Sequence, residues 1–285
     1  SLFQQQKWKD VVAATAALKG KGGNRSTRVS FQGAFALYQL QQYPESGAAF
    51  IALKPSVKGT KLQQQTHFLL GECLRNQAKF LPAIQEFGVA ASLEGDDAPE
   101  ALFRLSILHF NLKNFKDAAK NFDDYRVKFK DEVGLERSTD ARIFLGRSQV
   151  ELKQFKEAEK VFADLAAESK ATAKVFLWQG RMLQSQNKYA EAVKAIEGAL
   201  KKFPTDQLRP ELLFDFANNN LGLEKFPEAG KAFDDLRQAA PKFKEMAVLL
   251  HLNAVCKHNT KDFANSLKLC GEFLAGHAQH PRAAD

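Results

Sequence analysis

The stretch QNKYAEAVKAIEGALKKFP, residues 186–204, decides the fold of this 285-residue chain. Four of its side chains stand at offsets 0, 3, 7 and 10: Tyr189, Ala192, Ile196 and Ala199. These offsets place all four on one stripe of an α-helix, and Pro204 stands where such a helix should end. The stretch therefore predicts an amphipathic helix that buries one face against other parts of the chain.

Residues equivalent to Tyr189 recur along the whole chain, and we call them anchors. Their spacings are 35, 37, 35, 40, 34, 37 and 37 residues, which is the signature of an internal repeat. The anchors are Trp8, Tyr43, Phe80, Phe115, Phe155, Tyr189, Phe226 and Phe263.

Other positions, counted from the anchor, recur with it. Position −9 is always small, position +3 is nearly always small, and position +7 is Phe in five of the eight units. Small residues allow two helix backbones to approach closely, and a large residue fills the space between neighbouring units. Each unit is therefore predicted to be a hairpin of two antiparallel helices, an A helix before the anchor and a B helix that contains it. Such hairpins must stack, because one alone cannot bury its apolar face.

This pattern resembles the tetratricopeptide repeat family, whose unit of about 34 residues has the small residue, the aromatic residue, the alanine and the final proline in this order. Residues 173–204 fit best, with Gly180, Tyr189, Ala192, Ala199 and Pro204 all matching. The resemblance covers practically the entire chain. It implies an all-α fold, a right-handed superhelical solenoid of antiparallel helix pairs with about seven repeats plus a leading helix.

The predicted organisation is a single solenoid over residues 1–285. Residues 1–18 form the leading helix, and residues 279–285 form a tail. The repeats cover approximately 27–58, 64–95, 99–130, 139–170, 173–204, 210–241 and 247–278. The fourth repeat follows a longer loop, residues 128–138, and KGKGGNR, residues 19–25, is predicted to be an interhelix connection.

The composition gives no sign of catalysis. No glycine-rich loop follows a strand, the six histidines lack metal-ligand spacing, and the carboxylates alternate with lysines as on solvated helix faces. We therefore predict no enzyme activity, no cofactor and no metal. The three cysteines are expected to be small core residues, and a disulfide between Cys256 and Cys270 is left open.

Positive charge is concentrated at the amino-terminal end. Residues 1–61 hold nine Lys and Arg against two acidic residues, whereas the remaining 224 hold 32 bases and 31 acids. This asymmetry raises an alternative function, a basic helical-repeat module that binds RNA or another anionic polymer or surface, including peripheral contact with a membrane. Nucleic acid is the less favoured ligand, because repeats that read bases carry polar pairs in every unit.

The favoured function is a non-enzymatic scaffold that binds a peptide or a partner-protein segment. The resemblance implies that A-helix positions −12, −8 and −5 line a concave groove. Arginines there suit carboxylates, and asparagine suits a peptide backbone. The predicted groove residues are Phe68, Phe103, Phe110, Ile143, Arg147, Leu177, Arg181, Phe214 and Asn218.

Two helical stretches, within residues 96–131 and 140–165, also resemble repeats of bacterial cell-envelope proteins. This looser resemblance implies a periplasmic or cell-envelope location, with the cytoplasm as the alternative. The sequence leaves the partner and the oligomeric state open.

Overall fold

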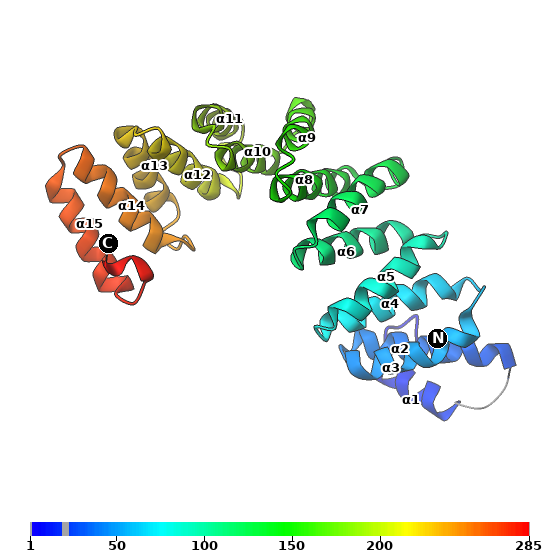
Figure 1. The fold of residues 1–285 in the computed structure, drawn as a ribbon. Helices are drawn as coiled ribbons and strands as arrows, with labels where there is room; N and C mark the ends of the chain where they lie inside the picture. The colour runs from blue at the N-terminus through cyan, green and yellow to red at the C-terminus, as the bar shows by residue number, and fades with distance from the viewer. Residues whose placement is uncertain (1, 19–22, 285) are drawn as a thin grey trace. The chain divides into compact units, whose positions relative to one another are not determined.

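The computed structural model describes residues 2–18 and 23–284, and within them the chain forms 15 α-helices, one 3₁₀ helix and no strand (Figure 1). The predicted all-α class is therefore confirmed. The chain divides into two compact units, residues 1–148 and 149–285, which we call unit one and unit two. Residues 19–22 lie outside the described residues, and they make up most of the predicted connection KGKGGNR, residues 19–25.

Unit one holds a leading helix, three helix pairs and most of an eighth helix. These are α1 (Trp8–Ala17), α2 (Gly23–Gln39), α3 (Tyr43–Val57), α4 (Leu62–Asn76), α5 (Phe80–Ser92), α6 (Ala98–Asn111), α7 (Phe115–Lys128) and α8 (Leu135–Glu151). Helix α8 begins four residues before the predicted repeat boundary, so the connection after α7 is shorter than the sequence suggested.

Unit two continues from the end of α8 with seven α-helices, and a short 3₁₀ helix follows them. These are α9 (Phe155–Ala167), α10 (Ala173–Ser185), α11 (Tyr189–Lys202), α12 (Arg209–Gly222), α13 (Phe226–Ala239), α14 (Met246–Asn259), α15 (Phe263–His277) and η1 (Pro281–Ala284). Helices α10 to α15 form three A and B pairs that contact each other in chain order.

Every anchor is the first residue of a B helix. The reason is a recurrent turn in which the residue at position −2 has positive φ, between 55° and 63° in the described turns. In all eight of these turns the backbone N–H at position −1 donates to the carbonyl at position −6, as Lys79 does to Leu74 at 2.9 Å. This is a Schellman-type helix end, and it reverses the chain within two residues. The residues with positive φ are Gln6, Gln41, Ala78, Lys113, Lys153, Asn187, Glu224 and Lys261.

Ala78→Gly should stabilise unit one by about 0.5–1 kcal/mol. Alanine at φ 57° brings its Cβ close to the following carbonyl, and glycine removes this strain at a smaller entropic cost. The measurement is the urea midpoint of unfolding. Asn187→Gly is the control, because asparagine tolerates the left-handed region and little gain is expected there. A lower midpoint for Ala78→Gly would contradict the strain at this turn.

The small residue at position −9 is required by the large residue at +7 of its own B helix. A Cβ added to Gly71 would lie 2.8 Å from the Phe87 ring, and one added to Gly180 would lie 2.7 Å from Ile196. Both +7 side chains are fully buried. In both units the small residue at −9 therefore lies against the large +7 residue of its own hairpin, a contact within the hairpin that the sequence pattern did not predict.

Serine at position +3 serves the same close approach. The Ser46 hydroxyl donates to the carbonyl of Ala34 at 2.8 Å, and the Ser266 hydroxyl donates to that of Ala254 at 2.9 Å. Each bond joins +3 of a B helix to −9 of its A helix. The serines that depart from the usual alanine are therefore satisfied by the partner helix rather than destabilising it.

Candidate functional site

Position −12 is a core position, which corrects the prediction that it lines a groove. Phe103, Ile143, Leu177 and Phe214 are buried, and Phe68 is half-buried. The reason is that −12 faces position +7 of the same hairpin. The ring centroids of Phe103 and Phe122 are 5.8 Å apart, those of Phe214 and Phe233 are 6.1 Å apart, and those of Phe68 and Phe87 are 5.8 Å apart.

Phe110 and Arg147 come together in unit one and stay partly exposed. The Arg147 guanidinium lies over the rings of Phe110 and Phe144, 4.6 Å from each centroid. Phe110 also packs against Phe115 and Phe144, with centroids 5.5 and 5.2 Å apart. Stacking on two aromatic faces orients the planar fork of an arginine, which is the group best suited to bind a carboxylate.

Arg181 in unit two is engaged by a neighbouring carboxylate. Its Nε lies 2.6 Å from Oδ2 of Asp215, which projects from the next A helix, and its guanidinium lies 4.9 Å from the centroid of Trp178. Burial raises the pKa of the Asp215 carboxyl, and the Arg181 hydrogen bond and charge lower it in part. Asn218, one turn beyond Asp215 on α12, is partly exposed.

The sequence did not reveal that position −11 pairs with position −8 of the preceding A helix. Asp215 is at −11 and Arg181 at −8, and Arg104 is at −11 and Glu72 at −8, with 3.6 Å between Arg104 Nε and Glu72 Oε1. The sequence does hold these oppositely charged residues 32 to 34 positions apart. They can be recognised as pairs only after neighbouring A helices have been aligned with each other.

In unit one this pairing extends into a network of charges across three A helices. Nη2 of Arg75 lies 2.8 Å from Oε2 of the buried Glu72, and Nε of Arg104 lies 2.9 Å from Oε1 of Glu100. Arg137 of α8 lies 3.1 Å from Glu100 and stacks 4.3 Å from the centroid of Phe103. Networked pairs of this kind fix the orientation of side chains more firmly than isolated surface pairs do.

Part of the basic charge at the amino-terminal end is neutralised inside unit one. Lys54 Nζ lies 2.7 Å from Oε1 of Glu86, and Nδ1 of His67 lies 2.6 Å from Oε2 of the same carboxylate. Lys19 and Lys21, which contribute to the predicted basic charge, lie outside the described residues.

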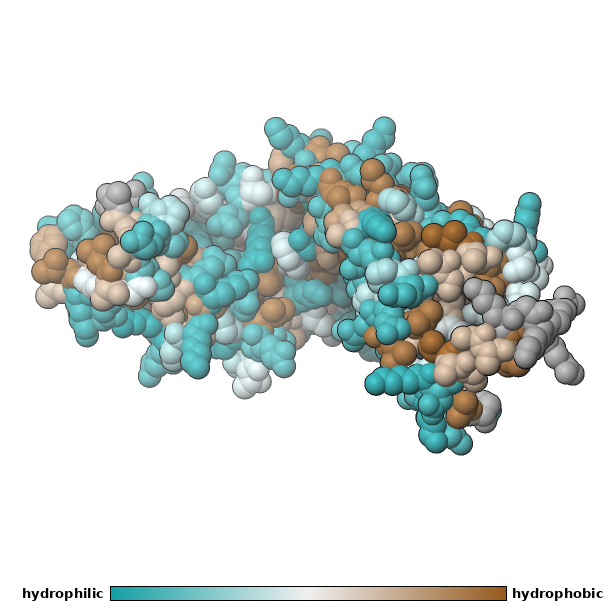
Figure 2. Space-filling view, turned by 90° about the horizontal axis from the view of Figure 1, so that it is seen from below, coloured by the Kyte–Doolittle hydropathy of each residue, from teal (hydrophilic) through white to brown (hydrophobic). Residues whose placement is uncertain are grey.

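On the face of the molecule in view in Figure 2, brown hydrophobic patches alternate with teal hydrophilic side chains.

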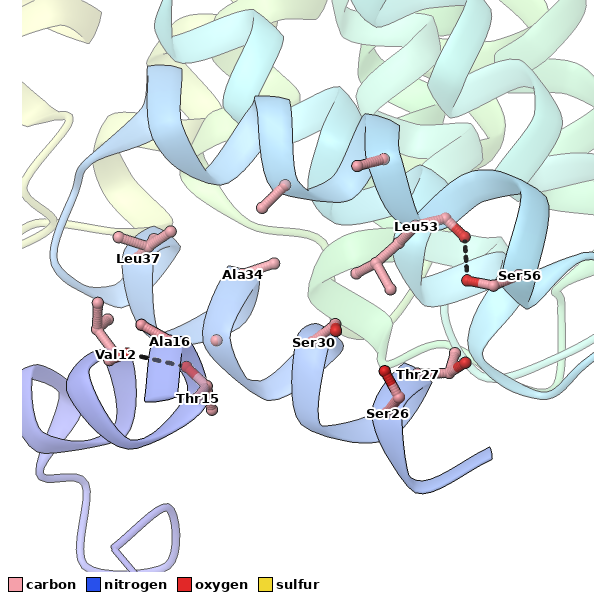
Figure 3. A pocket seen from close by; sticks show the side chains of 13 residues that line it. Val12, Thr15, Ala16, Ser26, Thr27, Ser30, Ala34, Leu37, Leu53 and Ser56 are labelled. Carbon is pink, nitrogen blue, oxygen red and sulfur yellow. Dashed lines mark hydrogen bonds between the residues drawn. The ribbon is translucent and has the colours of Figure 1, made fainter. Parts of the chain in front are cut away.

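A pocket of about 540 Å³ lies between α1, α2 and α3. It lies beside Thr15, which stands at position +7 of α1, where five other units have a phenylalanine. Hydroxyl groups of Ser26, Thr27 and Ser30 gather toward one end, and Leu37 lies toward the other (Figure 3). The pocket is therefore explained by the missing large side chain of the repeat.

Thr15→Phe should raise the free energy of unfolding by about 1 kcal/mol, because the ring fills this pocket as Phe87 fills the space beside Gly71. The measurement is the urea midpoint. The control is Thr15→Val, which restores no ring and should change the midpoint little. A midpoint lower for Phe than for Val would mean that the pocket cannot hold a ring.

The cysteines only partly follow the prediction. All three are free thiols, Cys73 and Cys256 are buried, and Cys270 is exposed rather than in the core. Burial raises the pKa of both buried thiols to about 11. Among the described residues, no group of three or more His, Cys, Asp or Glu is placed to hold a metal ion. None of the described helices combines the length and apolarity of a membrane span.

Comparisons with known proteins agree with this fold. A sequence model described as tetratricopeptide repeat matches residues 144–207. No curated protein matches the chain.

Solved structures are similar over most of the chain. One is a tetratricopeptide repeat protein from Parabacteroides merdae ATCC 43184, with 13% identity, 90% of this chain and 95% of that chain covered, and a TM-score of 0.64. Another is the C-terminal part of a TPR repeat-containing protein from Cytophaga hutchinsonii, with 17% identity, 87% and 96% covered, and a TM-score of 0.68. A third is the apo form of the quorum sensor NprR from B. thuringiensis, with 15% identity, 91% and 84% covered, and a TM-score of 0.58. At these identities the likeness is one of fold. Residues 144–207 therefore match tetratricopeptide repeats in sequence, and the chain as a whole has the fold of a tetratricopeptide repeat solenoid.

Proposed function

We propose that this protein is a non-enzymatic scaffold whose A-helix faces bind a segment of a partner protein. Tetratricopeptide repeats generally mediate protein–protein interaction, and the proposal goes further by assigning the binding to the residues that packing leaves partly exposed. Those residues are Phe68, Phe110 and Arg147 in unit one and Arg181 and Asn218 in unit two.

The observation that carries the proposal is the arrangement of Arg147 over Phe110 and Phe144. A guanidinium held 4.6 Å from two ring centroids has lost much of its rotamer freedom before any ligand arrives. Its planar fork then receives a carboxylate at a lower entropic cost than a mobile lysine would. The partly exposed Phe110 ring beside it offers an apolar contact. We expect the bound segment to combine an Asp or Glu side chain with an adjacent apolar residue.

In unit two the corresponding face is more polar. Asp215 already receives a hydrogen bond from Arg181, so this arginine presents its remaining donors in a fixed direction. The Asn218 amide, at the same repeat position of the next A helix, has both a donor and an acceptor for a peptide backbone. Unit two is therefore expected to bind main-chain groups, whereas unit one binds side chains.

The test is a selection of peptides from a random displayed library on the immobilised chain, followed by affinity measurements on the selected peptides. Arg147→Gln should weaken the selected acidic peptides by about tenfold or more, because a neutral amide replaces the charged fork. Asn218→Ala should weaken peptides that bind unit two.

The matched controls lie on the B helices. Lys120→Gln also removes one exposed positive charge in unit one, and its partner Asp124 lies on the same B helix. It should leave the affinity unchanged. Equal losses for Arg147→Gln and Lys120→Gln would show that net charge alone attracts the peptides. The same affinity for Arg147→Gln and the unaltered chain would remove the assignment of this face.

The cell-envelope location stays a prediction.

A further inference from the structure

The last B helix, α15, presents an apolar stripe to solvent. Phe263 is 57% exposed, Leu267 is 76% exposed and Leu274 is 50% exposed, and Cys270 between them is exposed as well. Figure 1 shows α15 with α14 beside it and no further α-helix of unit two on its other side. The buried face of the same helix is made by Ser266, Leu269 and Phe273. The stripe is therefore separate from the face that holds α15 in the fold.

In two other hairpins, contacts show that the next A helix covers equivalent positions of the B helix. Position +4 of α13 is Gly230, and a Cβ there would lie 3.2 Å from Cys256 of α14. The anchor Tyr189 of α11 lies beside Gly222 of α12, where an added Cβ would be 2.8 Å from the ring. Positions 0 and +4 of a B helix thus pack against the next A helix, and position +7 reaches it as well, as Phe122 of α7 does with Phe144 of α8. Among the described residues, no further α-helix follows α15 to cover these positions.

The spacing of the stripe indicates how a helix binds it. Intervals of 4, 3 and 4 residues are those of alternating d and a positions in a coiled coil. The neighbouring positions on the exposed side are Ala264 and Gly271, and a Cβ built on Gly271 meets nothing within 4 Å. Small residues there let a second backbone approach closely. No charged residue lies in the stripe, and Lys268 points away from it by helical position.

We propose that the stripe of α15 binds the same stripe of a second copy of this chain, with the two α15 helices antiparallel. In this register the two-fold axis passes between Leu267 and Cys270. Phe263 then lies opposite Leu274 of the second copy, and Leu267 lies opposite Cys270 of the second copy. Each large side chain meets a complementary position, as an isologous interface requires.

The size of the stripe sets the strength of the pairing. The three large side chains expose roughly 300 Å² per copy, so the two stripes together offer roughly 600 Å² of side-chain surface, which is the size of a weak, transient contact. The dimer is therefore reversible and depends on concentration.

The first measurement is the mass of the full chain by sedimentation, from about 1 to about 200 micromolar, a range suited to a weak complex. The unaltered chain should shift from monomer toward dimer. Leu267→Glu should stay monomeric with an unchanged circular dichroism spectrum, because the side chain is exposed. Lys268→Glu, one residue along and off the stripe, should dimerise as the unaltered chain does. A monomer throughout, or equal behaviour of the two glutamate variants, would overturn the proposal.

The second measurement tests the register. Phe263→Cys and Leu274→Cys are prepared separately, each with Cys270→Ser, and oxidised by glutathione disulfide. The mixture should give a disulfide-linked dimer, and neither variant alone should, because identical positions lie about 16 Å apart in the antiparallel pair. Cross-linking of either variant by itself would contradict this register. Since α15 lies outside the proposed peptide-binding residues, failure here leaves that proposal standing.

Discussion

Phe122→Ala should destabilise unit one by about 3–5 kcal/mol, the largest effect expected from a single truncation in this chain. The ring is fully buried at position +7 of α7, between Phe103 of its own A helix and Phe144 of α8. Its centroid lies 5.8 Å from that of Phe103 and 5.5 Å from that of Phe144. Alanine leaves a cavity that stacked helices of fixed spacing cannot collapse. The measurement is urea unfolding followed by circular dichroism.

The matched control is Phe80→Ala, the same truncation at a side chain that is 39% exposed. It should cost about 1 kcal/mol, because much of the ring is already in water and no closed cavity forms. Similar costs at the two positions would contradict the assignment of +7 as the main packing position. A selective loss at Phe122 would also show as faster amide exchange in α6 and α7 than in unit two.

Arg181→Ala should destabilise unit two by about 2–3 kcal/mol at neutral pH, because it leaves the buried carboxylate of Asp215 without its cation. Truncating Arg237, whose partner Glu272 is more exposed, should cost less than 1 kcal/mol. The comparison separates the burial of the carboxylate from the mere presence of an ion pair.

The loss at Arg181 should depend on pH in a definite direction. Burial already raises the pKa of Asp215, and Arg181 lowers it in part, so removing the arginine raises this pKa further. A raised carboxyl pKa means that the folded state holds its proton more tightly than the unfolded state does. The part of the destabilisation of Arg181→Ala that comes from the unpaired Asp215 charge is therefore complete above the raised pKa of Asp215 in the folded state. It disappears as the pH falls through that pKa, because the carboxyl then becomes neutral.

Urea midpoints at pH 7 and pH 4 measure this dependence. Arg181→Ala should differ from the unaltered chain less at pH 4 than at pH 7, and the double variant Arg181→Ala with Asp215→Asn should recover much of the neutral-pH loss. An equal deficit at both values of pH would mean that lost packing of the arginine stem, rather than the stranded charge, causes the effect.

The repeat, its hairpins and its packing positions follow from the sequence. The anchors mark the start of every B helix, and the small residues predicted to let the two helices approach, such as Gly71 and Gly180, stand where an added Cβ would clash with the facing B helix. These features are local or recur with a fixed period, so that each unit repeats the same information.

Three features required the tertiary structure. The turn residues with positive φ carry no glycine signal, because the hydrogen bonds of the helix end impose that conformation on Ala78 and Lys113 alike. The pairing of Arg181 with Asp215 joins two A helices whose alignment the sequence does not state.

The third feature is the distinction between core and surface among the predicted groove residues. Phe103 and Phe110 are both aromatic residues of α6, but Phe103 is buried against Phe122, whereas Phe110 contacts Phe115 at the start of α7 and stays partly exposed. The sequence by itself determined which side of each helix is apolar, because that depends on a period along one chain. Tertiary structure decided which part of that side another helix covers, because burial depends on neighbours that lie far away in the sequence.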